Sequence, residues 1–213
     1  MNPFPGYMEP QKKEMIGKLR AMGFSEKVLN AFDARPRHWF DQSFKHSMIY
    51  EIAALPSQKG QTISNPATVA LQTQLLNVQP GDKILEIGTG TGFQSAILDF
   101  LGARVFTIER DYNLASEANK LFKYFENKIF SHYGDGYEGL PRFAPFDKVL
   151  ITCAPPDIPE KLLDQLKVGG FMITPIGVED KQKMLKITKL DDENFECEEL
   201  GDCFFVPMLR DKV

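Results

Sequence analysis

Hydrophobic and polar positions change their spacing along the chain in a way that predicts strands and helices in alternation. An apolar run at residues 83–87 leads into three glycines at alternate positions, Gly88, Gly90 and Gly92, and apolar residues then recur at helical spacing. A second apolar run, at 104–109, ends on an acid. A buried parallel strand, a tight turn, a helix and a second strand produce this order. The segment therefore predicts the centre of an α/β fold.

The same spacing predicts further elements on both sides of this segment. Helical spacing occurs in five stretches, at 8–22, 25–32, 64–78, 113–125 and 158–166. Further strands are predicted at 129–130, 148–152, 171–175, 184–188 and 203–206, with the last two as a hairpin-like addition. Strands separated by helices imply right-handed crossovers. We expect a Rossmann-like α/β fold with a mostly parallel seven-stranded sheet and an N-terminal helical appendage.

Length and composition indicate one globular domain. The chain has 213 residues, of which 43% are hydrophobic and 25% are charged, and this suits a single domain with a substantial core. We expect residues 1–80 to supply N-terminal helices and a loop that covers substrate and cofactor. Residues 81–213 are then expected to form the cofactor-binding sheet core.

Charge, hydropathy and cysteine content indicate which kinds of partner and which cellular compartment suit the protein. A net charge of −4 argues against a nucleic-acid binder. No run reaches the ~18 apolar residues of a membrane span, and residues 1–20 lack the apolar core of a signal peptide. The three cysteines have no C-x-x-C spacing, which indicates reduced thiols and a cytoplasmic protein. The three histidines are scattered, so we expect no metal site.

The spacing of the glycines indicates which ligand the turn binds. Dinucleotide sites follow G-x-G-x-x-G, whereas this turn reads G-x-G-x-G and follows Glu86. A carboxylate at that place would repel a pyrophosphate and would suit the amino and sulfonium groups of S-adenosylmethionine. Glu109 follows the turn at the offset of about 20 residues that suits a ribose diol. Glycines that serve packing alone are the alternative interpretation.

A third acid follows the next predicted strand. Asp135 stands between Gly134 and Gly136, and this tripeptide is also a common turn regardless of any ligand. In open parallel sheets the ligand binds beyond the carboxyl ends of the strands. We therefore expect Glu86, Glu109 and Asp135 to converge on one crevice.

Eight segments between about residue 35 and residue 207 carry a family pattern: R-P-R-H-W-F at 35–40, G-Q-T-I-S-N-P at 60–66, L-E-I-G-T-G-T-G-F at 85–93, I-E-R at 108–110, G-D-G at 134–136, P-F-D at 145–147, A-P at 154–155 and F-V-P at 205–207. With these segments the sequence resembles the protein-L-isoaspartate O-methyltransferase family. The glycine turn is shared by many methyltransferases. The segment at 60–66 is therefore the specific signal.

The resemblance implies an S-adenosylmethionine-dependent methyltransferase fold with an unusual order of its last two strands. It implies methyl transfer to the free carboxylate of L-isoaspartyl residues in damaged proteins and peptides, which initiates repair, and we expect a monomer. Ser64 matches the position assigned as the active-site residue. The positions that match cofactor contacts are Thr62, Ile63, Ser64, Glu86, Gly88, Gly90, Gly92, Glu109, Arg110, Asp135 and Gly136.

Three positions depart from the family pattern. Phe93 stands where a tyrosine is frequent, Arg35 replaces a usual aliphatic residue, and Leu209 stands where some members carry a threonine. The last two departures bear on peptide recognition and not on the cofactor. From composition alone, Arg35 and Arg37 are expected to be solvated or in local ion pairs rather than in contact with a ligand.

The predicted reaction needs no general base. The acceptor carboxylate, with a pKa near ~3.5, is already ionised at neutral pH. We expect the Ser64 hydroxyl to hydrogen-bond and aim that carboxylate, but Ser64 could instead be the N-cap of the helix that begins near Pro66. Three other functions stay open: another S-adenosylmethionine-dependent carboxyl methyltransferase, a non-catalytic binding module, and an NAD-dependent oxidoreductase, with which the glycine spacing conflicts.

Overall fold

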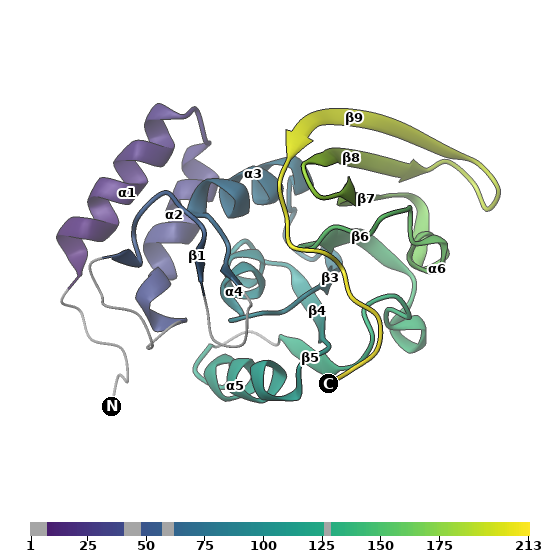
Figure 1. The fold of residues 1–213 in the computed structure, drawn as a ribbon, viewed down its shortest axis with the longest axis horizontal. Coiled ribbons are helices and arrows are strands. Elements are labelled where there is room, and N and C mark those ends of the chain that lie inside the picture. Colours follow the sequence, from purple (N-terminus) through teal and green to yellow (C-terminus); the bar gives the residue numbers. More distant parts are fainter. Residues whose placement is uncertain (1–7, 41–47, 57–61, 126–128) are drawn as a thin grey trace.

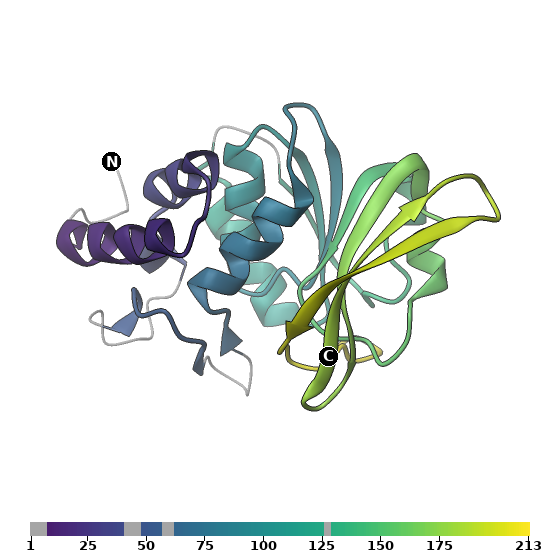
Figure 2. The same ribbon diagram turned by 90° about the horizontal axis from the view of Figure 1, so that it is seen from above.

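The computed structural model describes residues 8–40, 48–56, 62–125 and 129–213, and these form a central sheet with helices on both faces (Figure 1). The helices are α1 (Glu9–Ala21), α2 (Glu26–Ala34), α3 (Pro66–Leu76), α4 (Phe93–Phe100), α5 (Tyr112–Phe122) and α6 (Glu160–Leu163), with short 3-10 turns at Arg37–Trp39 and Pro141–Phe143. Helices α3, α4 and α5 cover one face, α1 and α2 lie outside them, and α6 covers the other face (Figure 2).

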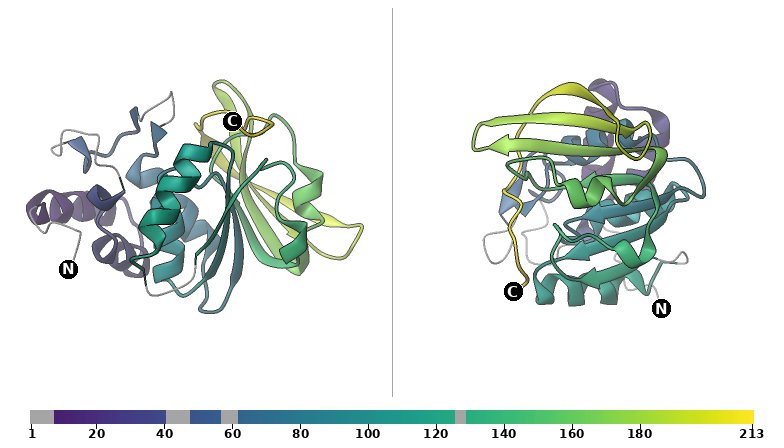
Figure 3. Two further views of the ribbon diagram at one scale, coloured as in Figure 1. Left: turned by 90° about the horizontal axis from the view of Figure 1, so that it is seen from below. Right: turned by 90° about the vertical axis from the view of Figure 1, so that its right-hand side faces the viewer.

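Seven strands form the main sheet, in the order β5-β4-β3-β6-β7-β8-β9. They are β3 (Lys83–Ile87), β4 (Arg104–Glu109), β5 (Phe130–Tyr133), β6 (Phe146–Ile151), β7 (Leu166–Val178), β8 (Lys181–Lys189) and β9 (Phe195–Cys203). The first five pair in parallel, and β8 and β9 add in antiparallel fashion as a long hairpin (Figure 3). Outside this sheet, β1 (Leu55–Pro56) pairs with β2 (Thr62–Ile63). The predicted mostly parallel seven-stranded sheet is confirmed.

The position of the last strand was predicted wrongly. Residues 203–206 were expected to form it, but β9 occupies Phe195–Cys203 and pairs with β8 along its whole length. This edge strand carries glutamates toward solvent, and Glu199 and Glu198 face Lys183 and Lys186 of β8 at 2.7 and 3.8 Å. Charged edge strands avoid further pairing, and they lack the apolar run that marks a central strand. Residues 204–206 lead instead to Pro207, which pairs with Ala154 after β6.

Other boundaries differ by a few residues. β5 extends to Tyr133, α6 is only Glu160–Leu163, and α5 ends at Phe122. β7 begins at Leu166, five residues before the predicted strand at 171–175, and includes Gly169 and Gly170. Such shifts are usual for element ends and do not change the topology.

The core lies on both faces of the sheet, which explains the uninterrupted apolar runs of its central strands. Along β3, Ile84 packs toward the helices α1 to α4, whereas Leu85 and Ile87 pack on the opposite face with Phe146 and the residues of α6. Glu86 therefore shares the face of Ile84, beneath α4. Among the described residues, no helix is long and apolar enough to span a bilayer.

Candidate functional site

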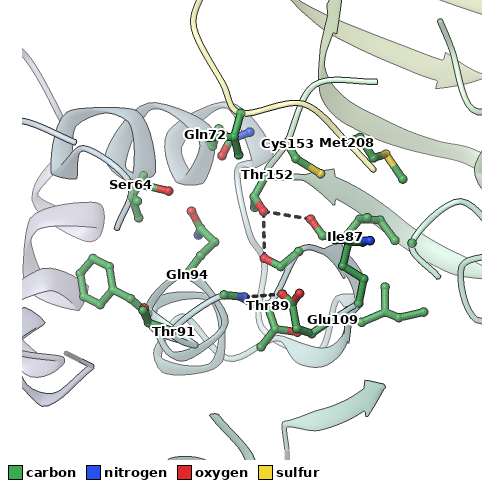
Figure 4. A pocket seen from close by; sticks show the side chains of 18 of the residues that line it. Ser64, Gln72, Ile87, Thr89, Thr91, Gln94, Glu109, Thr152, Cys153 and Met208 are labelled. Atoms are coloured by element: carbon green, nitrogen blue, oxygen red, sulfur yellow. Dashed lines mark hydrogen bonds between the residues drawn. The ribbon is translucent and has the colours of Figure 1, made fainter. Parts of the chain in front are cut away.

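A cleft opens beyond the carboxyl ends of β3, β4 and β6, the place where open α/β sheets bind ligands (Figure 4). The space between its walls, open solvent included, is about 980 Å³. Six of the predicted site residues line it: Ser64, Gly88, Gly90, Glu109, Arg110 and Gly136. The other lining residues used below are Arg37, Gln72, Phe93, Gln94, Thr152, Cys153, Met208 and Leu209.

The glycine turn forms the floor of the cleft. The N–H groups of Gly88 and Thr89 both donate to the carbonyl of Ile108, at 2.9 and 3.3 Å, so the turn is tied to β4. Gly88 has a φ of +93°, and a Cβ there would lie 2.5 Å from the Thr152 hydroxyl oxygen. Only glycine tolerates both this positive φ and the short distance to Thr152. The turn therefore offers bare main chain to a ligand.

Gly92 belongs to the same turn but does not line the cleft. It is the N-cap of α4 with a φ of +86°, and a Cβ there would lie 2.7 Å from the ring of Phe122 in α5. The glycine at this position allows α4 and α5 to approach each other. Its structural effect is on helix packing.

Glu109 lines the cleft directly above the glycine turn. Its Oε2 accepts from the Gly90 N–H at 2.9 Å, and its Oε1 accepts from the Asp111 N–H at 3.0 Å. The side chain is only 6% exposed. Backbone donors thus hold the carboxylate in one position, and its remaining lone pairs can accept from hydroxyl groups.

Glu86 lies beneath the turn rather than in the cleft. Its carboxyl group is fully buried and accepts from the Ser95 hydroxyl of α4. Burial raises the pKa of Glu86 to about 7. In the parallel register Glu86 is opposite Thr107, two residues before Glu109, so both acids lie on the same face of the sheet. Of the two, Glu109 alone reaches the cleft.

Asp135 does not line the cleft, in contrast to its neighbour Gly136. Its Oδ1 accepts from the Tyr137 N–H at 2.8 Å, and its Oδ2 accepts from the Asp211 N–H at 3.0 Å. Arg110 donates to the carbonyls of Arg210 and Asp211 at 3.2 and 2.9 Å. Asp135 and Arg110 therefore hold the chain after residue 207 in place.

That late segment forms the far wall of the cleft. Ala154, which follows β6, donates its N–H to Val206 and accepts from the Met208 N–H at 2.8 and 2.7 Å. This pairing places residues 206–209 along the cleft. Figure 4 shows Met208 beside Cys153 at this side. Burial raises the pKa of the Cys153 thiol to about 12, so the thiol is neutral.

Ser64 lines the opposite side of the cleft, and it is not the N-cap of α3. The cap is Asn65, whose Oδ1 accepts from the Ala67 N–H at 2.9 Å. The alternative structural role for Ser64 is therefore wrong, because the adjacent asparagine, directly before Pro66, already fills it. The strand β2, Thr62–Ile63, pairs with β1 and leads into Ser64.

Arg37 is a site residue that the sequence did not reveal. The side chain is 1% exposed and lines the cleft. Its guanidinium donates to the carbonyls of Ile49 and Ser64 and lies 5.5 Å from the centre of the Phe93 ring. The expectation of a solvated or locally paired arginine is wrong for Arg37, because its partners are backbone groups 12 and 27 residues away.

Arg35 does not line the cleft, as expected, but it is neither solvated nor in a local ion pair, because its partner Asp99 is 64 residues away. Its guanidinium is 3.5 Å from the buried Asp99 carboxylate and lies between the rings of Phe100 and Phe125, at 5.4 and 4.7 Å. It does not line the cleft, unlike Leu209. The arginine that replaces the usual aliphatic residue at position 35 therefore packs between α4 and the segment that follows α5.

The residues present fit S-adenosylmethionine. An added Cβ at Gly88 would meet the Thr152 hydroxyl oxygen at 2.5 Å, so the turn presents bare main chain there, and a held carboxylate, Glu109, faces the cleft at the strand end that suits a ribose. The wall around Gly136 and Met208 is apolar. Fold and site together define a Rossmann-like S-adenosylmethionine-dependent methyltransferase.

The comparisons give the family. The family model described as "Protein-L-isoaspartate(D-aspartate) O-methyltransferase (PCMT)" matches residues 10–212, and this chain belongs to that family. A protein-L-isoaspartate O-methyltransferase of Flavobacterium psychrophilum is 43% identical over 94% of this chain and 95% of its own. Another, of Cytophaga hutchinsonii, is 45% identical over 93% of this chain and 90% of its own.

A solved structure shares the fold. It is a putative protein-L-isoaspartate O-methyltransferase of Plasmodium falciparum in complex with S-adenosyl-L-homocysteine, with a TM-score of 0.82, 22% identity, and coverage of 93% of this chain and 98% of that one. The family match confirms the predicted family, the enzyme class, S-adenosylmethionine as the methyl donor and isoaspartyl carboxyl methylation. The oxidoreductase alternative is wrong.

Proposed function

We propose how this chain's residues methylate an isoaspartyl carboxylate: the glycine turn and Glu109 hold S-adenosylmethionine, and Ser64 holds the acceptor. One observation supports this assignment of the cofactor and the acceptor to separate residues. Ser64 and Glu109 lie on opposite sides of a single cleft, with the glycine turn between them (Figure 4). One side is thus suited to the cofactor and the other to the peptide.

On the cofactor side, the main chain at Gly88 and Gly90 would hold the methionine part, and Glu109 would accept from the ribose hydroxyls. Gly136 and Met208 would border the adenine. When bound, S-adenosylmethionine supplies a methyl group on a sulfonium cation. The other positions support the site: β2, Thr62–Ile63, leads into Ser64, and Glu86 and Gly92 support the turn. Asp135 and Arg110, which itself lines the cleft, hold the far wall.

On the acceptor side, the Ser64 hydroxyl donates to the isoaspartyl carboxylate and aims one oxygen at the methyl group. That carboxylate is ionised at neutral pH, so no residue has to remove a proton. Transfer joins an anion to a cation and annihilates both charges, so a partly dry cleft favours it. Alignment of oxygen, methyl and sulfur can contribute ~7–11 kcal/mol.

The finer partner assignments are also proposals. We propose a cytoplasmic monomer that acts on damaged proteins and peptides without binding nucleic acid or membranes. The net charge of −4 and the three free thiols support this assignment. We further propose a single methyltransferase domain, in which residues 1–80 cover the cleft and residues 81–213 hold the cofactor.

A labelled-methyl assay on paired isoaspartyl and aspartyl peptides tests the function. We expect transfer to the isoaspartyl peptide only, and Ser64→Ala should lower kcat by about tenfold or more with unchanged binding of S-adenosylhomocysteine. Asn65→Ala is the matched control, since it removes the helix cap and should lower thermal stability. A Ser64→Ala enzyme with normal turnover contradicts the role of Ser64. Binding of the cofactor without any transfer supports the non-catalytic alternative.

Glu109→Gln tests the cofactor side separately. Loss of a charge-assisted hydrogen bond to a hydroxyl should raise the dissociation constant of S-adenosylhomocysteine by about 10- to 100-fold. Isothermal titration calorimetry measures it, with the exposed Glu198→Gln as a control of equal charge change. An unchanged constant removes the ribose assignment.

A further inference from the structure

Gln94 places an amide group in the cleft that the steps above leave unused. It stands in the first turn of α4, directly after Phe93, and its side chain is 7% exposed. Figure 4 shows the side chain between Ser64, Gln72 and the glycine turn. Gln94 thus lies on the acceptor side of the cleft.

A chain of hydrogen bonds fixes which way the Gln94 amide points. The Thr73 hydroxyl donates to the Val69 carbonyl of α3 at 2.7 Å, which uses its only proton. Thr73 can then only accept from Gln94, and the Gln94 Nε2 lies 3.0 Å from the Thr73 oxygen. The amide NH₂ therefore faces α3, and the Oε1 is left for the cleft.

The Gln94 Oε1 is a buried acceptor that receives no hydrogen bond from any residue in the described part of the chain. Burying such a group without a donor is unfavourable. An acceptor held in this way between Ser64 and the glycine turn is complementary to a ligand that carries an N–H next to the group that Ser64 binds. It would also repel a carboxylate that entered in the wrong orientation.

The isoaspartyl residue has the required chemistry. Its free carboxylate and its peptide N–H are attached to the same carbon, whereas in a normal aspartyl residue the side-chain carboxylate is one methylene further from the N–H. Two groups at a fixed spacing, one that donates to the carboxylate and one that accepts from the N–H, can distinguish these arrangements.

We infer that Gln94 is a specificity-determining residue whose Oε1 accepts the N–H of the isoaspartyl residue while Ser64 binds its carboxylate. This inference rests on the proposed role of the cleft and adds the reason for its choice of substrate. A site built to accept a substrate N–H discriminates strongly against a substrate that does not present one in the right place.

The test combines a variant with an altered substrate. Gln94→Met keeps the length of the side chain and removes the acceptor. The substrate is an isoaspartyl peptide, compared with a depsipeptide in which an ester oxygen replaces the N–H of the isoaspartyl residue. The wild type should lose about tenfold or more in kcat/KM on the depsipeptide, and Gln94→Met should lose a similar factor on the normal peptide. Gln94→Met should treat the two peptides alike.

Controls separate this role from a structural one. Gln165→Met removes another buried glutamine, which bonds to the Leu140 N–H at 2.7 Å away from the cleft. It should lower stability without changing the ratio between the two peptides. Thermal unfolding of each variant shows whether Gln94→Met folds, and Gln94→Glu, with an acceptor of the same length, supplies a second variant.

Three outcomes would contradict the inference or the function on which it rests. Equal sensitivity of wild type and Gln94→Met to the ester replacement overturns it. Weaker binding of S-adenosylhomocysteine to Gln94→Met also overturns it, because the donor is then the cofactor's ammonium group. If the wild type transfers no methyl group to the isoaspartyl peptide, the proposed function fails first, independently of Gln94.

Discussion

The two sides of the cleft are built in different ways. On the side that we propose binds the cofactor, consecutive strands form the site: the turn after β3 bonds to the main chain of β4, and Glu109 at the end of β4 bonds back to the turn. On the acceptor side, Ser64 follows a two-residue strand, and the guanidinium of Arg37 joins it to Ile49. The cofactor side is thus part of the sheet, whereas the acceptor side depends on one buried side chain. We expect substitutions on the first side to remove cofactor binding and those on the second to change turnover alone.

Gly88→Ala should have the largest effect. The new Cβ would meet the Thr152 hydroxyl oxygen at 2.5 Å, and the φ of +93° strains any residue other than glycine. We expect S-adenosylhomocysteine to bind about 100-fold more weakly or not at all, measured by calorimetry. Gly17→Ala in α1 is the control, since nothing lies within 4 Å of its added Cβ. Normal binding by Gly88→Ala would show that the turn is not rigid.

Glu86→Gln should remove a pH dependence of stability. Burial raises the pKa of Glu86 from 4.5 to about 7, so the folded state holds this proton more tightly than the unfolded state does. The free energy of unfolding should therefore fall as pH rises from about 4.5 to 7, by on the order of 3 kcal/mol, and stay lowered above that range. Denaturant unfolding measures this in the wild type. The variant should lack this component and be the more stable protein above pH 7, and an unchanged pH profile would contradict it.

Arg37→Lys should have the smallest effect of the three, and it tests the acceptor side. A lysine ammonium can reach one of the two carbonyls that Arg37 binds but does not reproduce the planar fork that holds both. We expect kcat to fall by about tenfold, with binding of S-adenosylhomocysteine changed by less than about threefold. Arg35→Lys is the matched control, because Arg35 lies outside the cleft and should affect stability only. An equal loss of kcat in both variants would remove the distinction between the two arginines.

The sequence predicts the cofactor side well because its signals are local. The apolar runs at 83–87 and 104–109 coincide with β3 and β4, and the glycines between them form the turn. The acceptor side carries no such signal. The sequence around Arg37 does not indicate that its partners are the carbonyls of Ile49 and Ser64. The helical pattern after Gly92 likewise does not indicate that Gln94 of α4 contacts Thr73 of α3.

The wrong predictions also concern features that the local sequence does not determine. The N-cap of α3 was placed one residue early because serine and asparagine are both good caps, and only geometry selects Asn65. The edge strand β9 was missed because it carries glutamates in place of an apolar run. These glutamates pair with lysines of β8. Asp135 was placed in the crevice by its position after a strand, but its carboxylate is taken by the N–H groups of Tyr137 and Asp211.

The far wall of the cleft has a consequence for how the protein assembles. Arg110 and Asp211, which help to hold that wall, are 101 residues apart in sequence. Contacts of such separation require closure of a long loop and tend to form late in folding. A chain still emerging from the ribosome would therefore present the glycine turn before the wall around Met208 exists, and the nascent protein should be unable to retain its methyl donor until that final segment docks.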